Sequence, residues 1–209
     1  MPMPKQKLTE RGRAARARIL AAAEPIFAAR GFYGANVREL AAAAGAPTAS
    51  LLHHFPSKEK LYAAILSEVA ADLEARLGAV IDAGDSIAER LEAAVGAYLD
   101  WSAERPDRSN LLLRELLDNP VRLGDQSHLV MAPLVDRISR FVRVGQRAGE
   151  LRAMSPLVFI THLVGSAAYF CAARPTFEKM VPARQRASLS RRFRREIAPL
   201  ICQSLLEQS

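Results

Sequence analysis

The fold is decided by residues 19–62, which read ILAAAEPIFAARGFYGANVRELAAAAGAPTASLLHHFPSKEKLY. Asn36 is a good helix N-cap, and Glu39 three residues later completes a capping box. Apolar residues then recur at helical spacing, at Val37, Leu40, Ala41 and Ala44. Gly45 supplies the positive φ of a sharp turn, because it has no Cβ. These features predict a short helix that ends in a tight turn.

A second short helix follows this turn. Pro47 is tolerated in the first turn of a helix, and Leu51 is the apolar anchor that faces inward. Residues 48–50, Thr-Ala-Ser, are small or polar and lie on the opening turn. Two short helices joined by a glycine turn form a helix-turn-helix, which lays its second helix in the major groove of DNA. We predict this motif at about residues 36–55.

The motif and its flanks resemble the N-terminal domain of the TetR (tetracycline-repressor-like) transcriptional regulators. The matching pieces are Ile19-Leu20, Ala23, Phe27, Arg30-Gly31-Phe32, Val37-Arg38-Glu39-Leu40-Ala41, Ala44-Gly45, Ser50-Leu51 and His53-His54-Phe55-Pro56-Ser57-Lys58-Glu59-Lys60-Leu61. The resemblance implies an all-α protein. Its N-terminal three-helix helix-turn-helix domain would cover residues 13–73, and a C-terminal helical domain for ligand sensing and dimerisation would cover residues 74–209.

Three positions depart from the family pattern. Pro25 falls inside the first helix, where a proline removes a backbone hydrogen bond and kinks the helix. Thr48 stands where many relatives carry a lysine. Leu52 replaces an aromatic residue, commonly a tyrosine that touches the DNA backbone in relatives. The last two departures concern the detail of phosphate contact and leave the motif intact.

The resemblance also implies which residues contact DNA. Two basic residues open helices and face the phosphate backbone, where helix N-termini also favour phosphate. On the second helix of the motif, hydroxyl groups reach base edges and a methyl group contacts thymine. The alternative for each basic residue is a solvated surface charge. The predicted DNA-binding residues are Arg38, Thr48, Ala49, Ser50, Leu52, His53 and Lys58.

The charge is unevenly placed along the chain. Residues 1–60 hold ten Lys and Arg against four Asp and Glu, whereas residues 61–173 hold eleven against fifteen. A basic head on an acidic body indicates a polyanionic partner at the head. The basic N-terminal arm either follows the DNA or is only a solvated tail. That arm contains Lys5, Lys7, Arg11, Arg13, Arg16 and Arg18.

The rest of the chain has a helical pattern throughout. A helix capped by Ser57 carries one apolar stripe, at Leu61, Ile65, Val69, Leu73, Leu77 and Ile81. Asp85, or Ser86 with Glu89, caps the next helix, and Ser155-Pro156 starts a later one. We expect Gly31, Asn119-Pro120 and Arg174-Pro175 to end helices, and a last helix to begin at Pro182 or Arg184.

The resemblance implies a homodimer and a small-molecule pocket in the C-terminal domain. A twofold dimer presents two recognition helices to a palindromic operator. Small residues on the helix after Pro156 allow close helix–helix approach, and the predicted interface is Gly165, Ala168, Phe193 and Ile197. The predicted pocket residues are Tyr98, Trp101, His128, Met131, Phe141, Phe159, His162 and Tyr169. Ordinary core packing is the alternative for each of them.

Other classes of protein fit this sequence poorly. It contains no glycine-rich phosphate loop, serine elbow or paired carboxylate set, so we expect no enzyme and no cofactor. Cys171 and Cys202 lack metal-ligand spacing, and His53 with His54 cannot aim at one ion, so we expect no metal. Residues 155–173 are apolar but interrupted, which favours a buried interface helix over a membrane span. We therefore predict a cytoplasmic, ligand-responsive DNA-binding regulator, most simply a repressor, with a ligand-independent or activating regulator as the alternative.

Overall fold

A computed structural model describes residues 10–84, 86–122 and 130–206, which are helical apart from one isolated β-bridge between Leu151 and Leu206. This agrees with the predicted all-α class. The helices are α1 (Glu10–Gly34), α2 (Val37–Ala43), α3 (Thr48–His54), α4 (Lys58–Ile81), α5 (Ile87–Glu104), α6 (Pro106–Arg122), α7 (Ala132–Arg147), α8 (Pro156–Met180), α9 (Ala183–Arg186) and α10 (Leu189–Leu205).

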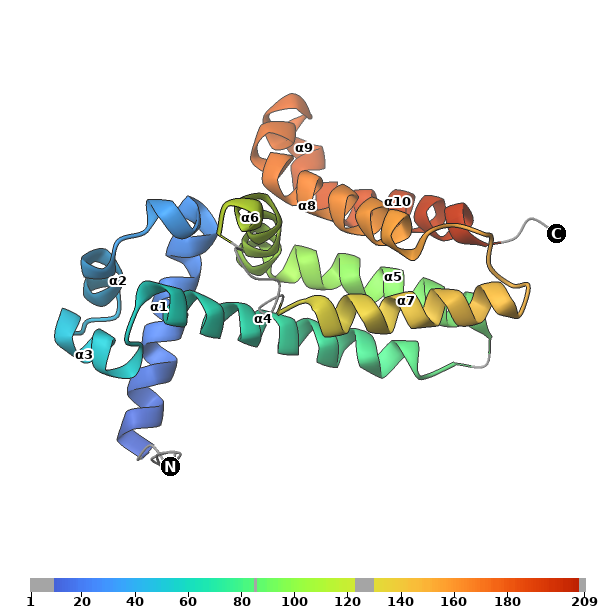
Figure 1. Ribbon diagram of the computed structural model, residues 1–209. Helices are drawn as coiled ribbons and strands as arrows, with labels where there is room; N and C mark the ends of the chain where they lie inside the picture. Colours follow the sequence, from blue (N-terminus) through green and yellow to red (C-terminus); the bar gives the residue numbers. More distant parts are fainter. Residues whose placement is uncertain (1–9, 85, 123–129, 207–209) are drawn as a thin grey trace, which may run out of the picture.

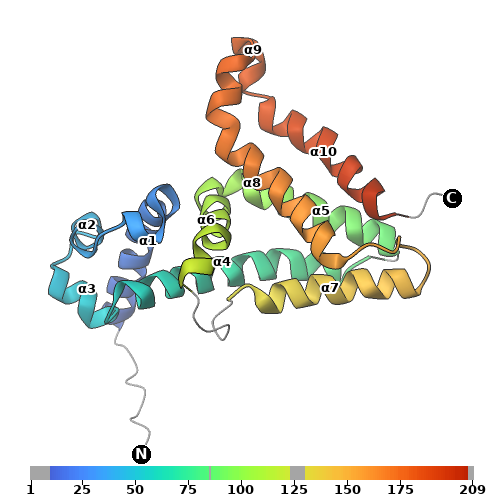
Figure 2. The same cartoon turned by 45° about the horizontal axis from the view of Figure 1, so that its top comes forward.

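The helices form two parts that share α4 (Figure 1). The head consists of α1, α2, α3 and the first turns of α4, and it lies at one end of the molecule. The body consists of the rest of α4 with α5 to α10. Helix α6 stands between the head and the body, and α8 and α10 meet at α9 in a projecting V (Figure 2).

Helix α4 connects the head to the body without a break. Ser57 caps its N-terminus, because the Ser57 hydroxyl accepts a hydrogen bond of 3.3 Å from the backbone N–H of Lys60. All six residues of the predicted apolar stripe are buried: Leu61, Ile65, Val69, Leu73, Leu77 and Ile81. Leu61 and Ile65 are buried in the head, and Leu77 and Ile81 are buried in the body. A single apolar face of α4 is therefore buried in both parts.

The predicted caps occur where the sequence placed them. Ser86 and Glu89 form a complete capping box at α5. At α2, the Asn36 side chain accepts from the backbone N–H of Glu39 at 2.9 Å, but the Glu39 carboxylate pairs with Arg30 at 2.7 Å instead of returning to the Asn36 backbone N–H. Glu39 therefore also holds α2 against α1.

Two predicted helix ends are wrong. Helix α6 continues past Asn119-Pro120 to Arg122, and α8 continues past Arg174-Pro175 to Met180. In α8 the turn after Pro175 is held by Phe177, whose ring lies 6.2 Å from those of both Tyr169 and Phe170. These contacts offset the hydrogen bond that the proline removes.

The other helix ends follow the predictions more closely. The backbone of α1 stays helical through Pro25 and departs from helical geometry at Gly31, where φ is 70° and ψ is −179°. The predicted end at Gly31 is therefore confirmed, and a further short turn follows it. The predicted last helix divides into α9 and α10.

The end of the chain is tied to the loop between α7 and α8. The backbone N–H of Arg152 donates to the carbonyl of Leu205 at 2.8 Å. Gly145 makes this closure possible, because a Cβ there would lie 2.5 Å from Leu151 Cδ1 and 2.9 Å from Ile87 Cγ2. Both distances are shorter than van der Waals contact, so α7 approaches the loop closely only because residue 145 is glycine.

Substituting Gly145→Ala should therefore destabilise the body. We expect the free energy of unfolding, measured by urea denaturation, to fall by about 1–3 kcal/mol, because the added methyl group overpacks a buried contact. An unchanged free energy of unfolding would show that Leu151 has room to move aside.

Candidate nucleic-acid interface

The head contributes buried residues to a core that continues into the body, and these residues fix the angle between the head helices. Leu40 of α2 and Leu51 of α3 are fully buried. The Tyr62 ring of α4 meets the rings of Phe27 and Phe32 edge to face, with centroids 4.9 and 5.3 Å apart. Such aromatic pairs are stabilising beyond the area that they bury. The two short helices of the motif are thus held against α1 and α4.

The turn between α2 and α3 has the predicted geometry. Gly45 has φ of 61°, a left-handed conformation that disfavours any residue with a Cβ. The backbone N–H of Ala46 donates to the carbonyl of Ala41 at 3.0 Å and closes the turn. Ala41 is buried, and its small side chain leaves room for α3 to cross close by.

The predicted base-reading residues come together on α3. Leu51 points into the head core, whereas Ala49, Leu52 and His53 are exposed and Thr48 and Ser50 are half-buried. These residues occupy fewer than two turns of one helix, so their outward side chains form one short surface. Hydroxyl, methyl and imidazole groups are among the groups that read base edges in a groove.

Arg38 lies beside this surface on the first turn of α2. Its side chain is exposed and makes no ion pair within the part of the chain that the structure describes. The guanidinium is therefore available for a phosphate, and the N-terminus of α2 adds a favourable dipole. The contact itself stays a prediction.

Lys58 has a role inside the head that the sequence did not reveal. Its ammonium group donates to the carbonyls of Phe32 and Ala35 at 2.9 and 3.1 Å, and it lies 4.3 Å from the centre of the Phe32 ring. A lysine at a helix N-terminus is unfavourable with respect to the helix dipole, and these carbonyls offset that. Lys58 thus fastens the turn between α1 and α2 to the start of α4, whatever contact it also makes with DNA.

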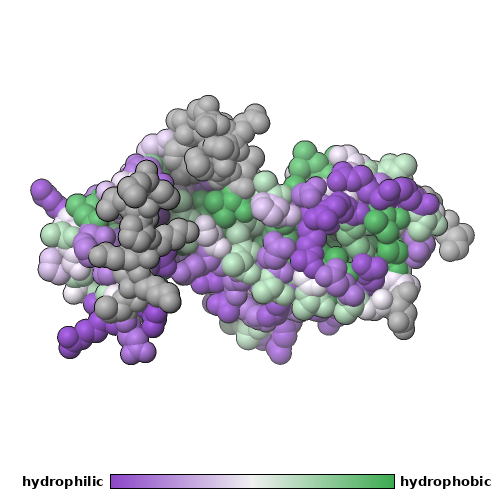
Figure 3. Space-filling view, turned by 60° about the horizontal axis from the view of Figure 1, so that its bottom comes forward, coloured by the Kyte–Doolittle hydropathy of each residue, from purple (hydrophilic) through white to green (hydrophobic). Residues whose placement is uncertain are grey.

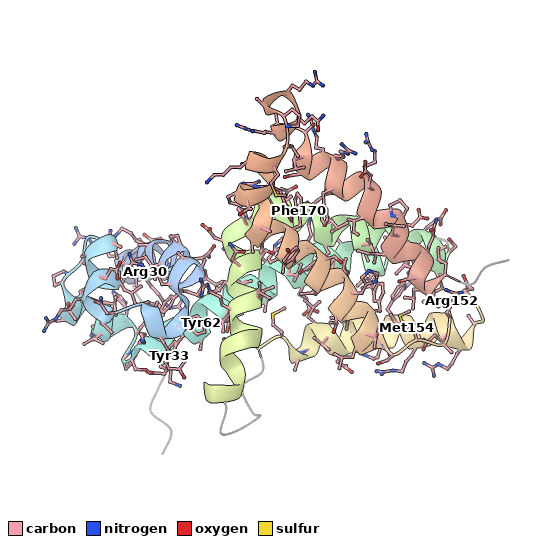
Figure 4. The ribbon with its side chains drawn as sticks, turned by 90° about the horizontal axis from the view of Figure 1, so that it is seen from above. Arg30, Tyr33, Tyr62, Arg152, Met154 and Phe170 are labelled. Atoms are coloured by element: carbon pink, nitrogen blue, oxygen red, sulfur yellow. The ribbon has the colours of Figure 1, made fainter. Side chains whose placement is uncertain are left out.

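The turn between α1 and α2 also carries an exposed aromatic residue that was not among the predicted DNA-binding residues. Tyr33 lies between the two carbonyls that bind Lys58, it is 59% exposed, and its ring meets that of Phe32 edge to face. Its hydroxyl is a hydrogen-bond donor on the exposed turn that precedes α2. The sequence indicated this exposed position only by placing Tyr33 three residues before the Asn36 cap. Figure 4 shows Arg30, Tyr33 and Tyr62 in the head, far from Phe170, Met154 and Arg152 in the body.

The basic arm is described from Glu10 onward. Arg11, Arg13 and Arg18 are exposed, whereas Arg16 lies 5.0 Å from the centre of the Phe55 ring and 3.9 Å from Glu68. Arg16 therefore packs against the head. The two lysines of the arm, Lys5 and Lys7, lie outside the described residues.

Comparison with known families identifies this head and this body. Residues 19–65 match the model of bacterial regulatory proteins of the tetR family, and residues 88–200 match the tetracyclin repressor-like C-terminal domain. The chain belongs to the TetR family. TetR proteins are helix-turn-helix transcriptional regulators and not enzymes.

Sequence similarity to curated TetR regulators covers a short part of this chain. RutR of Escherichia coli K12 is 43% identical over 51 residues, which cover 24% of this chain and 24% of RutR. The repressor AcnR of Corynebacterium efficiens is 45% identical over 56 residues, covering 27% and 30% of the two chains. The matches thus span 24% and 30% of the length of these two relatives.

Solved structures share the whole fold at lower identity. A tetR-family regulatory protein from Rhodococcus RHA1 has a TM-score of 0.73 at 21% identity, covering 93% of this chain and 98% of that one. The ketosteroid regulator KstR2 of Mycobacterium tuberculosis has 0.70 at 19%, covering 97% and 100%. AibR, solved with isovaleryl coenzyme A and operator DNA, has 0.63 at 20%, covering 76% and 86%.

The predicted pocket residues divide into two groups. Tyr98, Trp101, Phe141 and Phe159 are buried in the body, and Met131 is half-buried against the same core. Burial raises the pKa of the Tyr98 hydroxyl. His162 and Tyr169 were placed in the interior wrongly: both are exposed on α8, because the apolar run around them did not indicate which face turns inward. His128 lies outside the described residues.

A small cavity lies elsewhere, between α5, α8 and α10. It has a volume of about 90 Å³ and is lined by none of the predicted pocket residues, but by residues that include Ser102, Cys171 and Arg194. Both cysteines are free, and burial raises the pKa of Cys202 to about 11. Among the described residues there is no group of three His, Cys, Asp or Glu that could hold a metal.

The predicted interface residues lie on the V of α8 and α10. Gly165 is exposed and Ala168 is buried, while Phe193 and Ile197 are half-buried. Phe193 stacks on Phe170 with ring centroids 3.9 Å apart, so it packs within its own chain. An open groove of about 680 Å³ runs between the two helices and is lined mainly by apolar residues, among them Tyr169, Phe177, Met180, Leu189 and Ile197.

Helix α8 is unusually apolar for its exposure. It is long and apolar enough to cross a membrane, with mean hydropathy 1.5, yet only 28% of its most apolar segment is buried. Leu157, Val158, Tyr169 and Met180 are all more than half exposed. The side of the molecule away from α9 has, by contrast, many hydrophilic residues with smaller hydrophobic areas between them (Figure 3).

Replacing Lys58 with alanine should weaken the head itself. The variant loses two charge-assisted hydrogen bonds to carbonyls, so we expect the free energy of unfolding to fall by about 1–2 kcal/mol. Lys60→Ala, which removes an exposed lysine two residues away, is the control and should leave stability unchanged. If Lys58→Ala were as stable as the control, the contacts of Lys58 with the turn would not contribute to the stability of the head.

Proposed function

We propose that this TetR protein is a repressor that binds a palindromic operator as a homodimer and is released by a small-molecule effector. The observation that carries the proposal is the surface of α3. A buried leucine anchors this short helix, and small polar side chains project from it at the end of the molecule. A rigid helix with such a face is what major-groove reading requires.

Within the proposed complex the head residues have two different tasks. Arg38, Lys58 and Tyr33 surround the N-termini of α2 and α4 and position the head on phosphates. The outward-facing residues of α3 read the bases, with Ser50 and Thr48 as hydrogen-bonding groups and Ala49 against a thymine methyl group. Phosphate contacts supply affinity, and base contacts supply specificity.

The homodimer is proposed from the exposed apolar surface of α8 and α10. Contiguous apolar surface of this kind on a soluble regulator marks an interaction site. Gly165, which is exposed on α8, lets two such surfaces approach closely, and the groove beside Phe193 and Ile197 accepts side chains of the second copy. A twofold dimer carries two α3 helices and thus reads two half-sites.

The effector is proposed from the extent of the body. Helices α4 to α10 form a larger apolar core than dimerisation requires, and the buried residues Tyr98, Trp101, Phe141 and Phe159 with Met131 are the proposed lining. AibR was solved with isovaleryl coenzyme A and operator DNA, which is a precedent for a regulator of this fold that binds a small molecule. A ligand that prefers one arrangement of α4 would change the separation of the heads. We place the division between head and body at residues 73 and 74, and the protein in the cytoplasm.

The docking of α3 is tested by Ser50→Asp. A carboxylate at this position faces the negatively charged groove, so we expect operator affinity in mobility-shift titrations to fall about a hundredfold. Ala43→Asp adds the same charge to an exposed residue of α2 and is the matched control. If Ser50→Asp bound its operator as tightly as that control, α3 would not be the reading helix.

The proposed interface is tested by Tyr169→Arg. Tyr169 is 67% exposed on α8, so the change should leave each chain folded, while a dimer would bury an unpaired charge. We expect the dimer dissociation constant from sedimentation equilibrium to rise about thirtyfold. Val144→Arg, on the exposed face of α7, is the control. Equal dissociation constants for the two variants would place the interface elsewhere.

A further inference from the structure

Helix α6 holds the head through a partly buried ion pair. Arg108 of α6 donates from Nε and Nη2 to both carboxylate oxygens of Glu24 on α1, at 3.0 and 3.1 Å. Its Nη1 lies 2.9 Å from Asp72 on α4. The side chains of Arg108 and Glu24 are only 18% and 19% exposed, so solvent screens this pair less than the surface ion pairs.

A second arginine of α6, Arg114, contacts α1 about one turn after Glu24. Arg114 donates to the carbonyl of Ala28 at 2.8 Å and to that of Ala29 at 2.6 Å. The helical geometry of α1 breaks at Gly31, so these carbonyls belong to the last turn before the break. A cation at this end of a helix segment also meets its dipole favourably.

The network continues into the core of the body. Asp72 accepts a hydrogen bond of 2.8 Å from the indole N–H of Trp101 on α5 and lies 3.2 Å from Arg105. Burial by itself would raise the pKa of Asp72, but Trp101 and the two arginines outweigh it and hold the pKa below its ordinary value. Trp101 is buried beside Tyr98, with ring centroids 6.1 Å apart. Four helices therefore meet through charged and polar side chains at this point.

These contacts restrict how the head can move. Helix α4 alone joins the two parts as one continuous element, and one helix leaves the head free to swing. Arg108 and Arg114 fix α1 on α6 at two points, near Glu24 and near Ala28. Rotation or sliding of α1 along α6 breaks one of the two attachments.

We propose that Arg108 and Arg114, together the α6 clamp, set the angle of the head on the body and carry changes in the body to the helix-turn-helix. The clamp acts beside α4 as a second connection. A change in the body core at Trp101 would reach the clamp through Asp72 and would move α1. Helix α2 would move with α1, because the Arg30–Glu39 pair holds the two helices together. As far as DNA is concerned, the inference rests on the proposed function.

The clamp is tested first without DNA, in the full-length protein. Spin labels on an unnatural ketone amino acid replace exposed Ala42 in α2 and Ala93 in α5, and labelled chains are diluted with unlabelled protein so that only distances within one chain are measured. The clamp variant is Glu24→Gln with Arg108→Gln, which leaves no unpaired charge between these two positions. Asp136→Asn with Arg140→Gln, an exposed pair within α7, is the matched control.

We expect the clamp variant to broaden or shift the distance distribution, while the control keeps that of the wild type. Arg114→Gln is measured in parallel, because it removes the second attachment without touching the ion pair, and it should also broaden or shift the distribution. Distributions that match the wild type in both variants would overturn the proposal.

A second test uses DNA duplexes in which two half-sites are separated by different spacers. A fixed head angle favours one spacing, and we expect the clamp variant to lose about tenfold of the wild-type preference over a spacer two base pairs longer, with single half-site binding unchanged. An undiminished preference would count against the clamp. If the wild type selects no palindrome at all, the proposed function fails, and the distance measurement still decides the clamp.

Discussion

The structure depends on one continuous apolar stripe along α4 that must be buried at both of its ends. Leu61 and Ile65 complete the core of the head, and Leu77 and Ile81 complete that of the body. Neither part covers the whole stripe, so head and body are folded onto one shared helix rather than joined by a flexible linker. The position of α3 relative to the body is therefore set by α4, and by Arg108 and Arg114 of α6, which contact α1.

The same principle, a buried residue that fixes an exposed one, explains the head. Leu51 is buried so that its neighbours on α3 face outward, and Gly45 allows the turn that brings α3 across α2. Two charged residues stabilise the head from within. Lys58 donates to the carbonyls of Phe32 and Ala35, and Glu39 pairs with Arg30. The result is a surface whose shape is set before any DNA arrives. Preorganisation of this kind lowers the entropy lost on binding.

Much of this architecture was predictable from local patterns. The caps at Asn36, Ser57 and Ser86 and the stripe of α4 follow from spacing alone, because they involve residues within a few positions of each other. Contacts between distant residues were not predictable: Arg108 meets Glu24 across 84 positions, and nothing near either residue indicates the pairing. The prolines at 120 and 175 were read as helix ends, yet both helices continue past them, and in α8 the ring of Phe177 packs near Tyr169 and Phe170 of the same helix. His162 and Tyr169 were misplaced because an apolar run does not indicate which side of its helix is buried.

The central claim, that this TetR protein reads DNA as a twofold dimer through α3, is tested most directly by selecting the purified wild-type protein against random-sequence duplexes. The account predicts recovery of a palindrome whose two halves lie about one helical turn apart or a multiple of it, as two symmetry-related recognition helices require. Recovery of a single, non-repeated half-site would contradict the dimer. Weak binding without sequence preference would contradict the reading role of α3.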